Sequence, residues 1–237
     1  MGAGDRIVGV TDACDYPPEA NEKPHICSWF DPDMERIRNL APDLVIGLET
    51  AHGKMQAAFK ATGVQLLLFN PVCMADALTD ILNLGVLLDL QHAARSMVDK
   101  LQERIDKLTE HVRQIPPDKY LTVSRVLDIE NDRMIVAGPK SFQFDVIACA
   151  GGINVTGDIQ EAYPKVSFEQ FKKWDPKMIF FCGSDNRRIA HIKSDPAWQS
   201  LRAVQQDRIH QFDCGLTCRT GPRIVDMAEL LYKTLYA

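Results

Sequence analysis

The sequence lacks several features that would place it in a large class of proteins. It contains no run of about 18 apolar residues, the length that a membrane-spanning helix needs. Its net charge of −5 and the absence of a basic block argue against a nucleic-acid-binding surface. Met1–Arg6 leads into Ile7–Val10 without the basic and apolar regions of a signal peptide. Taken literally, these features predict a soluble cytoplasmic protein.

The motifs of common catalytic and metal sites are also missing. No Gly-x-Ser-x-Gly, Walker loop, Gly-x-Gly-x-x-Gly or His-Glu-x-x-His pattern occurs, and the six histidines lack zinc-ligand spacing. The seven cysteines include no Cys-x-x-Cys, and only Cys214 and Cys218 lie close in sequence. A disulfide or a soft-metal site there stays open, but reduced and mostly buried thiols are favoured. We expect a binding protein with no catalytic residue, no metal ligands and no cofactor.

One long amphipathic segment, residues 89–115, lies near the middle of the chain. Six apolar residues recur there at intervals of three or four: Met97, Leu101, Ile105, Leu108, Val112 and Ile115. This spacing predicts one helix, about 40 Å long, which Pro116-Pro117 ends. Such a helix can bridge two lobes or pack as an ordinary helix on one sheet.

Short apolar runs alternate with helical patterns on both sides of this segment. The first part has expected strands at 6–10, 43–48 and 64–69 and expected helices at 31–40, 52–61 and 75–84. The second part has expected strands at 121–127, 134–136, 177–182 and 208–212, and expected helices at 141–150, 167–174, 195–204 and 222–236. This alternation predicts an α/β fold with mainly parallel sheets. We therefore divide the chain into an N-terminal lobe (1–88), a bridging helix (89–115) and a C-terminal lobe (116–237).

The sequences of the two predicted lobes contain a short internal repeat. Trp29, Glu35 and Pro42 recur 134 residues later as Tyr163, Glu169 and Pro176, and a buried strand follows each proline. Matches in register indicate that the lobes repeat one plan. Each glutamate is expected in the first turn of a helix, where it can simply complement the helix dipole. Equivalent placement in both halves favours a two-fold symmetric partner instead.

These residues resemble the helical-backbone substrate-binding proteins of ABC importers, which bind cobalamin, ferric siderophores or haem. The matching stretches follow the family's order and cover nearly the whole chain: Asp5–Val10, Tyr16–Ala20, Met34–Ile37, Leu40–Ile46, Ala137–Phe142, Ala150–Asn154, Val166–Glu169 and Arg219–Arg223. The resemblance implies two α/β sandwich lobes, one long bridging helix and a metal chelate held in the cleft between the lobes. It also implies that Glu35 and Glu169 dock to arginines of the membrane permease, a pseudo-symmetric dimer.

The resemblance implies ligand-contacting residues as well. Trp29 and Tyr163 match positions where aromatic rings meet the ligand, and Arg219 matches a ligand-contacting arginine. Aromatic faces suit a planar macrocycle or a catechol, and arginine pairs with carboxylate or phosphate. The alternatives are a core aromatic and a solvated arginine. Cys14 is expected in a loop that borders the cleft, together with Cys27, Cys214 and Cys218, either as a ligand or in a rim of small residues.

The start of the chain departs from the family pattern. Relatives have about twenty more residues there, a strand and a helix, and the export signal precedes them. We expect a shortened chain or a start site assigned too late, and a periplasmic protein or extracytoplasmic lipoprotein. A first lobe without that strand would expose a sheet edge, which predicts a homodimer or another segment that covers the edge.

Two other functions remain open at this stage. One is a cytoplasmic metal- or tetrapyrrole-handling enzyme of a related two-lobed fold that uses His25, His52, Glu49 and the cysteines. The other is a defective fragment that binds no ligand. The leading prediction is the substrate-binding protein, whose ligand could be a ferric siderophore, haem or a corrinoid.

Overall fold

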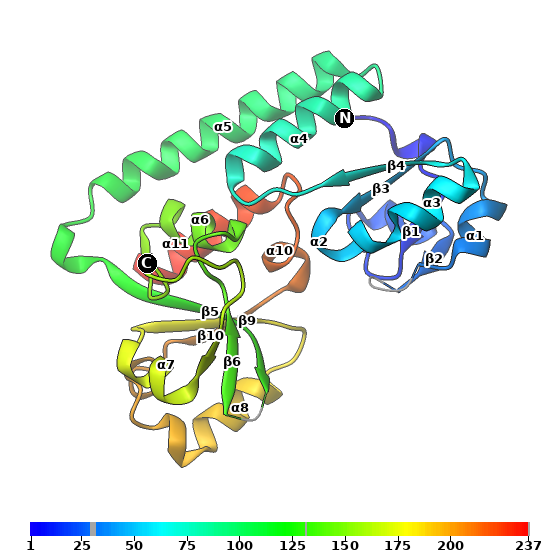
Figure 1. The fold of residues 1–237 in the computed structure, drawn as a ribbon. Helices are drawn as coiled ribbons and strands as arrows, with labels where there is room; N and C mark the ends of the chain where they lie inside the picture. Colours follow the sequence, from blue (N-terminus) through cyan, green and yellow to red (C-terminus); the bar gives the residue numbers. More distant parts are fainter. Residues whose placement is uncertain (29–31, 131, 237) are drawn as a thin grey trace. The chain divides into compact units, whose positions relative to one another are not determined.

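The computed structural model describes residues 1–28, 32–130 and 132–236 of the 237-residue chain (Figure 1). The chain forms two compact units. Unit 1 contains Met1–Asn70 and Leu82–Ala94, and unit 2 contains Pro71–Ile81 and Arg95–Ala237. Two of the three boundaries fall inside helices, at 81/82 in α4 (Met74–Leu87) and at 94/95 in α5 (Gln91–Arg113), so each of these helices contributes residues to both units. No helix in the described ranges has the length and hydropathy to cross a membrane. The lobe boundaries at 88 and 115 stay a prediction.

Unit 1 contains two small parallel pairs of strands. Strand β1 (Val10–Thr11) pairs with β2 (His25–Cys27), and β3 (Leu44–Leu48) pairs with β4 (Gln65–Phe69). The helices of this unit are α1 (Met34–Asn39), α2 (Glu49–His52) and α3 (Gln56–Thr62), with short 3-10 turns at Gly4–Arg6, Pro18–Glu22 and Gly53–Met55. Among its described residues, Ile37 and Phe59 are almost fully buried. The parallel pairing of the predicted strands 43–48 and 64–69 is confirmed.

Three local predictions in unit 1 were wrong. A strand over 6–10 was expected, but Gly4–Arg6 forms a 3-10 turn and the strand begins at Val10. Helix 31–40 was expected to begin at Asp31-Pro32. Instead α1 begins at Met34, because the Asp33 carboxylate accepts hydrogen bonds from two backbone amides of the first turn, and Asp31 lies outside the described residues. The run 43–48 was expected to be buried, but Ile46 is 48% exposed in a sheet of two strands.

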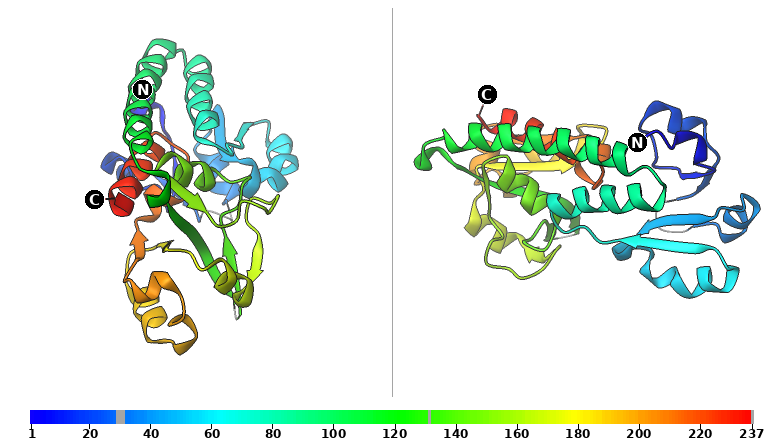
Figure 2. Two further views of the ribbon diagram at one scale, coloured as in Figure 1. Left: turned by 90° about the vertical axis from the view of Figure 1, so that its left-hand side faces the viewer. Right: turned by 90° about the horizontal axis from the view of Figure 1, so that it is seen from above.

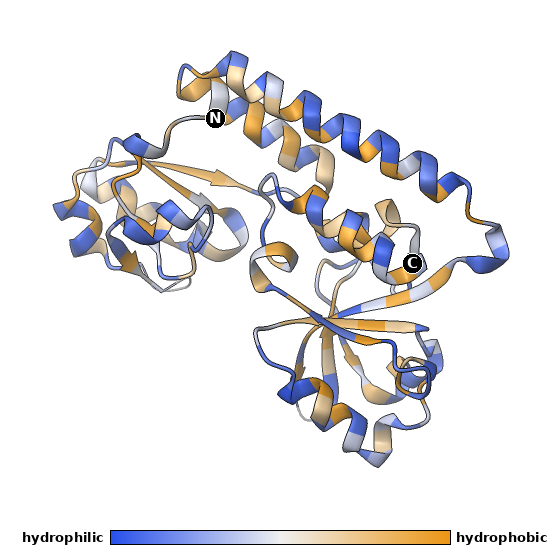
Figure 3. Ribbon diagram, turned by 180° about the vertical axis from the view of Figure 1, so that it is seen from behind, coloured by the Kyte–Doolittle hydropathy of each residue, from blue (hydrophilic) through white to orange (hydrophobic). Residues whose placement is uncertain are grey.

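The long amphipathic segment forms a single helix, α5, as predicted, although it spans Gln91–Arg113 rather than 89–115. Asp89 has a positive φ of 56°, which ends the preceding helix α4. The Leu90 amide then donates to the Gly85 carbonyl at 2.7 Å, so the end of α4 and the start of α5 form a helical hairpin (Figure 2). Hydrophilic and hydrophobic residues alternate along α5, as expected for an amphipathic helix (Figure 3).

Unit 2 is built on a mixed six-stranded sheet in the order β10-β9-β5-β6-β8, with β7 also paired to β5. The strands are β5 (Leu121–Glu130), β6 (Arg133–Val136), β7 (Gly152–Asn154), β8 (Lys165–Ser167), β9 (Met178–Cys182) and β10 (Ile209–Phe212). Strands β7, β5, β9 and β10 are parallel neighbours, whereas β6 is antiparallel to both of its neighbours, β5 and β8. The predicted α/β class with largely parallel sheets is confirmed.

Side chains on alternate positions of these strands build two cores. Ile179 and Phe181 on β9 point to the face where α7 (Phe168–Trp174) and α8 (Arg187–Ser194) contribute Phe171 and Ile192. Phe180 points to the opposite face, because strand side chains alternate. The helices α6 (Phe142–Cys149) and α11 (Ile224–Tyr236) pack against each other and are largely buried.

Two helix predictions in unit 2 had different outcomes. The Ser167 hydroxyl accepts a hydrogen bond from the Gln170 amide at 3.2 Å, so the predicted capping pattern begins α7. The segment 195–204 was expected to form one helix, but it forms a 3-10 turn (Pro196–Trp198) and a separate helix α9 (Arg202–Gln205). Helix α8 was not predicted from the sequence.

Candidate functional site

A cluster of thiols lies at the carboxyl ends of strands β9 and β10 in unit 2. Cys182 is the last residue of β9, and the chain passes from β10 into the short helix α10 (Cys214–Thr217), which is followed by Cys218. The Sγ atoms of Cys182, Cys214 and Cys218 all lie within 4.8 Å of one another. The carboxyl ends of parallel strands are the usual place for ligand sites in open α/β sheets.

A buried arginine adjoins the thiols. Arg125 on β5 is 1% exposed, its Nη2 atom lies 3.8 Å from the Cys218 Sγ, and its guanidinium lies over the Phe180 ring. The Nη1 atom donates to the Val126 carbonyl, whereas Nε has no hydrogen-bond partner. No Asp or Glu among the described residues forms an ion pair with Arg125. Burying a cation without a carboxylate partner is costly, so negative charge on the neighbouring thiols is favoured.

The three thiols differ in acidity. The Cys218 thiol donates a hydrogen bond to the Cys182 sulfur, and with the nearby Arg125 charge this lowers the pKa of Cys182 to about 5, although burial opposes the shift. Burial and the hydrogen bond to Cys182 raise the pKa of Cys214 to about 11. The hydrogen bond to Cys182 and burial also raise the pKa of Cys218. Cys182 is therefore the most acidic of the three thiols.

Tyr163, one of the predicted ligand contacts, lies near this cluster. Its hydroxyl donates to Gln143 Oε1 at 3.2 Å, and the buried Gln143 amide donates to the Thr217 carbonyl at 3.5 Å. Burial of the hydroxyl raises the pKa of Tyr163. The residue as a whole is 39% exposed. Arg219 follows Cys218 directly and is half-buried.

The other two predicted ligand contacts are Trp29 and Cys14. Trp29 lies outside the described residues. Cys14 is in unit 1, where its sulfur lies 3.2 Å from the Thr11 hydroxyl. Unit 2 therefore brings Tyr163 and Arg219 near the same loop, and the ligand-binding role of all four residues stays a prediction.

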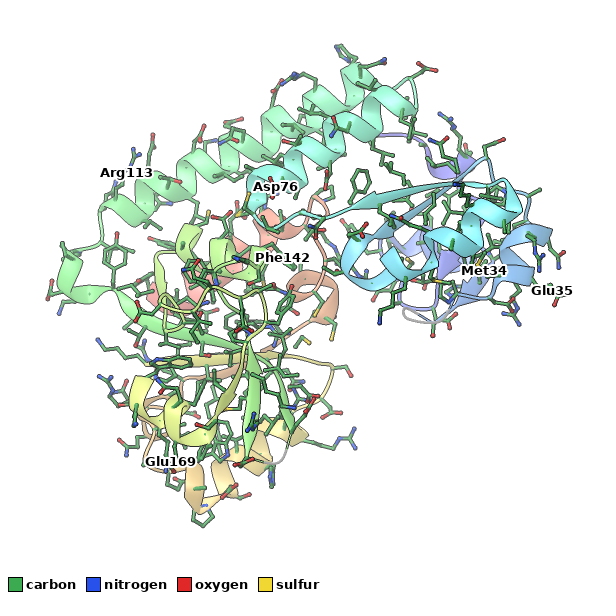
Figure 4. All side chains as sticks on the ribbon, in the orientation of Figure 1. Met34, Glu35, Asp76, Arg113, Phe142 and Glu169 are labelled. Carbon is green, nitrogen blue, oxygen red and sulfur yellow. The ribbon has the colours of Figure 1, made fainter. Side chains whose placement is uncertain are left out.

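The two glutamates predicted to contact a permease both lie in the first turn of an exposed helix. Glu35 is in α1 and Glu169 is in α7, and both side chains point outward from their own units (Figure 4). Glu169 is 75% exposed and forms an ion pair with Lys172 at 2.5 Å. Neither carboxylate is buried, so each is accessible to a partner. Their docking role stays a prediction.

The histidines named for the alternative enzyme have local partners within unit 1. His52 Nδ1 accepts a hydrogen bond from the Leu48 amide at 3.0 Å, and His25 lies 3.5 Å from Asp12. In the part of the chain that the structure describes, the one group of three His, Cys, Asp or Glu side chains close enough to hold a metal ion is Cys182, Cys214 and Cys218. His25, His52 and Glu49 are not part of it.

The sequence analysis missed one member of the thiol cluster, Cys182, and the arginine beside the cluster, Arg125. Cys182 ends a predicted buried strand, and its distance in sequence from Cys214 hid the contact. Arg125 is the one charged residue in the predicted strand 121–127, and a charge within a strand expected to be buried is the signal that could have identified it.

Comparison with known proteins agrees with this fold. Residues 1–213 match the Periplasmic binding protein family. The vitamin B12-binding protein of Vibrio cholerae serotype O1 is 24% identical over 230 residues, which cover 96% of this chain and 80% of that protein. An ABC transporter substrate-binding lipoprotein of Bacillus subtilis (YvrC) is 22% identical over 240 residues, which cover 100% of this chain and 75% of that protein.

The apo form of the periplasmic heme-binding protein RhuT from Roseiflexus sp. RS-1 has the same fold, with a TM-score of 0.87 and 24% identity across 99% of this chain and 91% of that one. A family match over most of the chain, together with this fold, shows that the chain belongs to the periplasmic binding protein family.

Proposed function

We propose that this chain is the substrate-binding component of an ABC importer and captures a metal chelate: a ferric siderophore, haem or a corrinoid. The family match over residues 1–213 carries this proposal. The names of the similar proteins support it, since they include a vitamin B12-binding protein, an ABC transporter substrate-binding lipoprotein and a heme-binding protein. Such a protein acts outside the cytoplasm and binds its cargo without catalysing a reaction.

The ligand contacts of this proposal are Trp29, Tyr163, Arg219 and Cys14. An aromatic face packs against a flat, rigid chelate, and an arginine pairs with its carboxylate or phosphate groups. Two of these residues, Tyr163 and Arg219, lie in unit 2. Tyr163 is 39% exposed, and Arg219 follows closely after Thr217, whose carbonyl accepts the hydrogen bond from Gln143; both observations support a role in ligand binding. Affinity would come from burying a large rigid ligand on preformed surfaces, which limits the entropy lost on binding.

A ligand panel tests the proposal. The melting temperature of the chain is measured with cyanocobalamin, haemin and several ferric siderophores, and tryptophan fluorescence quenching gives the affinities. We expect one chelate class to raise the melting temperature, because a ligand that binds only the native state stabilises it.

Tyr163→Ala and Arg219→Ala are each expected to weaken binding about tenfold, a loss of about 1.4 kcal/mol. Arg187→Ala is the matched control, since Arg187 is 90% exposed and pairs with Asp185. No stabilisation by any chelate would refute the proposal.

We also propose that Glu35 and Glu169 dock to basic residues of the permease. Both are exposed in the first turns of α1 and α7. Glu35→Lys and Glu169→Lys place like charges opposite a basic partner, so binding to the permease–ATPase complex in nanodiscs should weaken while chelate affinity is unchanged. Glu110→Lys on the exposed surface of α5 is the control. Unchanged complex formation by both variants would contradict the docking role.

A further inference from the structure

The thiol cluster has the dimensions of a three-coordinate metal site. A thiolate sulfur lies about 2.3 Å from a bound metal ion such as zinc, so three sulfurs around one ion are about 3.8–4.0 Å apart. Cys182, Cys214 and Cys218 already hold their Sγ atoms within 4.8 Å of one another. The three sulfurs therefore need to approach one another by no more than about 1 Å to share one ion. Cys214 and Cys218 are four residues apart across helix α10, so one helical turn supplies two of the ligands.

The charge of the surroundings fits an anionic metal centre. Three thiolates around a monovalent or divalent ion leave a net charge of about −2 or −1. Arg125 supplies a buried positive charge, with Nη2 at 3.8 Å from the Cys218 sulfur and an Nε atom that has no hydrogen-bond partner in the described structure. A buried guanidinium without a carboxylate partner is a group that a metal–thiolate centre would compensate.

The ligand set also selects the type of metal. Thiolates are soft donors that favour Cu(I), Zn(II) and related thiophilic ions over Mg(II) or Ca(II). No His, Asp or Glu of the described residues completes the group, so a fourth coordination position on the ion would be open. A metal chelate arrives with its ion already coordinated, whereas this cluster suits an ion that exchanges its ligands for three cysteines.

We propose that Cys182, Cys214 and Cys218 bind one thiophilic metal ion as a trithiolate site, with Arg125 as the countercharge. The site lies within unit 2 and does not depend on the transport function proposed above. Each thiol loses its proton to solvent as its sulfur bonds to the metal, and no redox step is involved.

The test uses the full chain, reduced and anaerobic, with Co(II) as the spectroscopic probe and Zn(II) as its competitor. We expect one Co(II) per chain, a thiolate-to-metal charge-transfer band, and displacement of Co(II) by Zn(II). Cys182→Ser, Cys214→Ser and Cys218→Ser should each weaken the charge-transfer band and lower the Zn(II) affinity at least about tenfold. Cys73→Ser is the matched control, because Cys73 is half-buried and lies outside the cluster.

Circular dichroism of each variant separates loss of a ligand from loss of the fold, and Cys214→Ser and Cys218→Ser are the milder substitutions because both residues are exposed. Zinc should also protect three thiols of the wild-type protein from alkylation. Absence of the charge-transfer band in both wild type and Cys73→Ser would overturn the proposal. Wild-type affinity in all three cluster variants would overturn it as well.

Discussion

Gly138 lies very close to the segment 161–164, which contains Tyr163. The position of Tyr163 depends on this close approach. A Cβ atom at Gly138 would lie 2.2 Å from the Glu161 carbonyl oxygen and 2.8 Å from Pro164 Cδ. The Gly138 amide donates to the Ala162 carbonyl at 2.8 Å, and the Lys140 amide donates to the Glu161 carbonyl at 3.4 Å. The substitution Gly138→Ala therefore presses a methyl group against backbone that cannot rotate away.

The expected loss follows from these distances. Real Cβ contacts essentially never fall below 3.0 Å, so the segments must separate by about 0.8 Å. That shift lengthens the 2.8 Å hydrogen bond to about 3.6 Å and also breaks the longer one, at about 1 kcal/mol each. Replacing glycine by alanine restricts the unfolded chain and returns about 0.4–1 kcal/mol. We expect a net destabilisation of about 1–2 kcal/mol.

Urea unfolding of the variant measures this value. Gly157→Ala is the matched control in the same unit, because a Cβ atom there would meet only the Asn154 carbonyl at 3.9 Å. The control should be as stable as wild type or more stable by up to about 1 kcal/mol. Since Tyr163 lies in the displaced segment, Gly138→Ala should also weaken chelate binding. Equal stability of the two variants would refute the reasoning.

The other predictions concern charge, a helix cap and an open sheet edge. The hydrogen bond from the Arg104 guanidinium lowers the pKa of Glu229 in the folded protein. The stability that this pair contributes is therefore fully present above the pKa of Glu229 in the unfolded chain. It is lost as the pH falls through the lower pKa of Glu229 in the folded protein. In Glu229→Gln, the loss of unfolding free energy between neutral and acid pH should be smaller than in wild type by about 1 kcal/mol or less, because both groups are partly solvated. An unchanged dependence of the unfolding free energy on pH would contradict this. Ser167→Ala removes the cap of α7 and should cost about 1 kcal/mol in thermal unfolding, whereas Glu110→Ala should not. Strands β3 and β4 pair only with each other among the described residues, so light scattering should give a mass above the monomer's 26.6 kDa, and a monomer contradicts the predicted dimer.

The sequence predicts the elements that rest on strong periodicity or on local capping. The apolar intervals of α5 and the serine before α7 both indicate the correct structure. The exact start of α1 could not be predicted, because Asp31 and Asp33 both precede the helix and only the folded turn decides which carboxylate caps it. The burial of β3 could not be predicted either, since burial depends on what covers the sheet rather than on the strand itself.

The candidate site was predictable only in part. Tyr163 and Arg219 were identified through a resemblance that spans the chain, whereas the contact between Cys182 and the pair Cys214 and Cys218 depends on β9 and β10 being parallel neighbours. Sequence spacing contains no information about that pairing. The buried Arg125 has a visible signal in the sequence, a charge within a predicted strand, but its neighbour Cys218 is identified only when the strands are assembled.

The unit boundaries at 70/71, 81/82 and 94/95 have a practical consequence for work with fragments. The backbone passes from one unit to the other three times, and two of these passages lie inside continuous helices. No single proteolytic cut can release either unit with all of its own residues. Expression of a simple N-terminal or C-terminal half should therefore give an unstable polypeptide, and substitutions in α4 or α5 can alter both units at once.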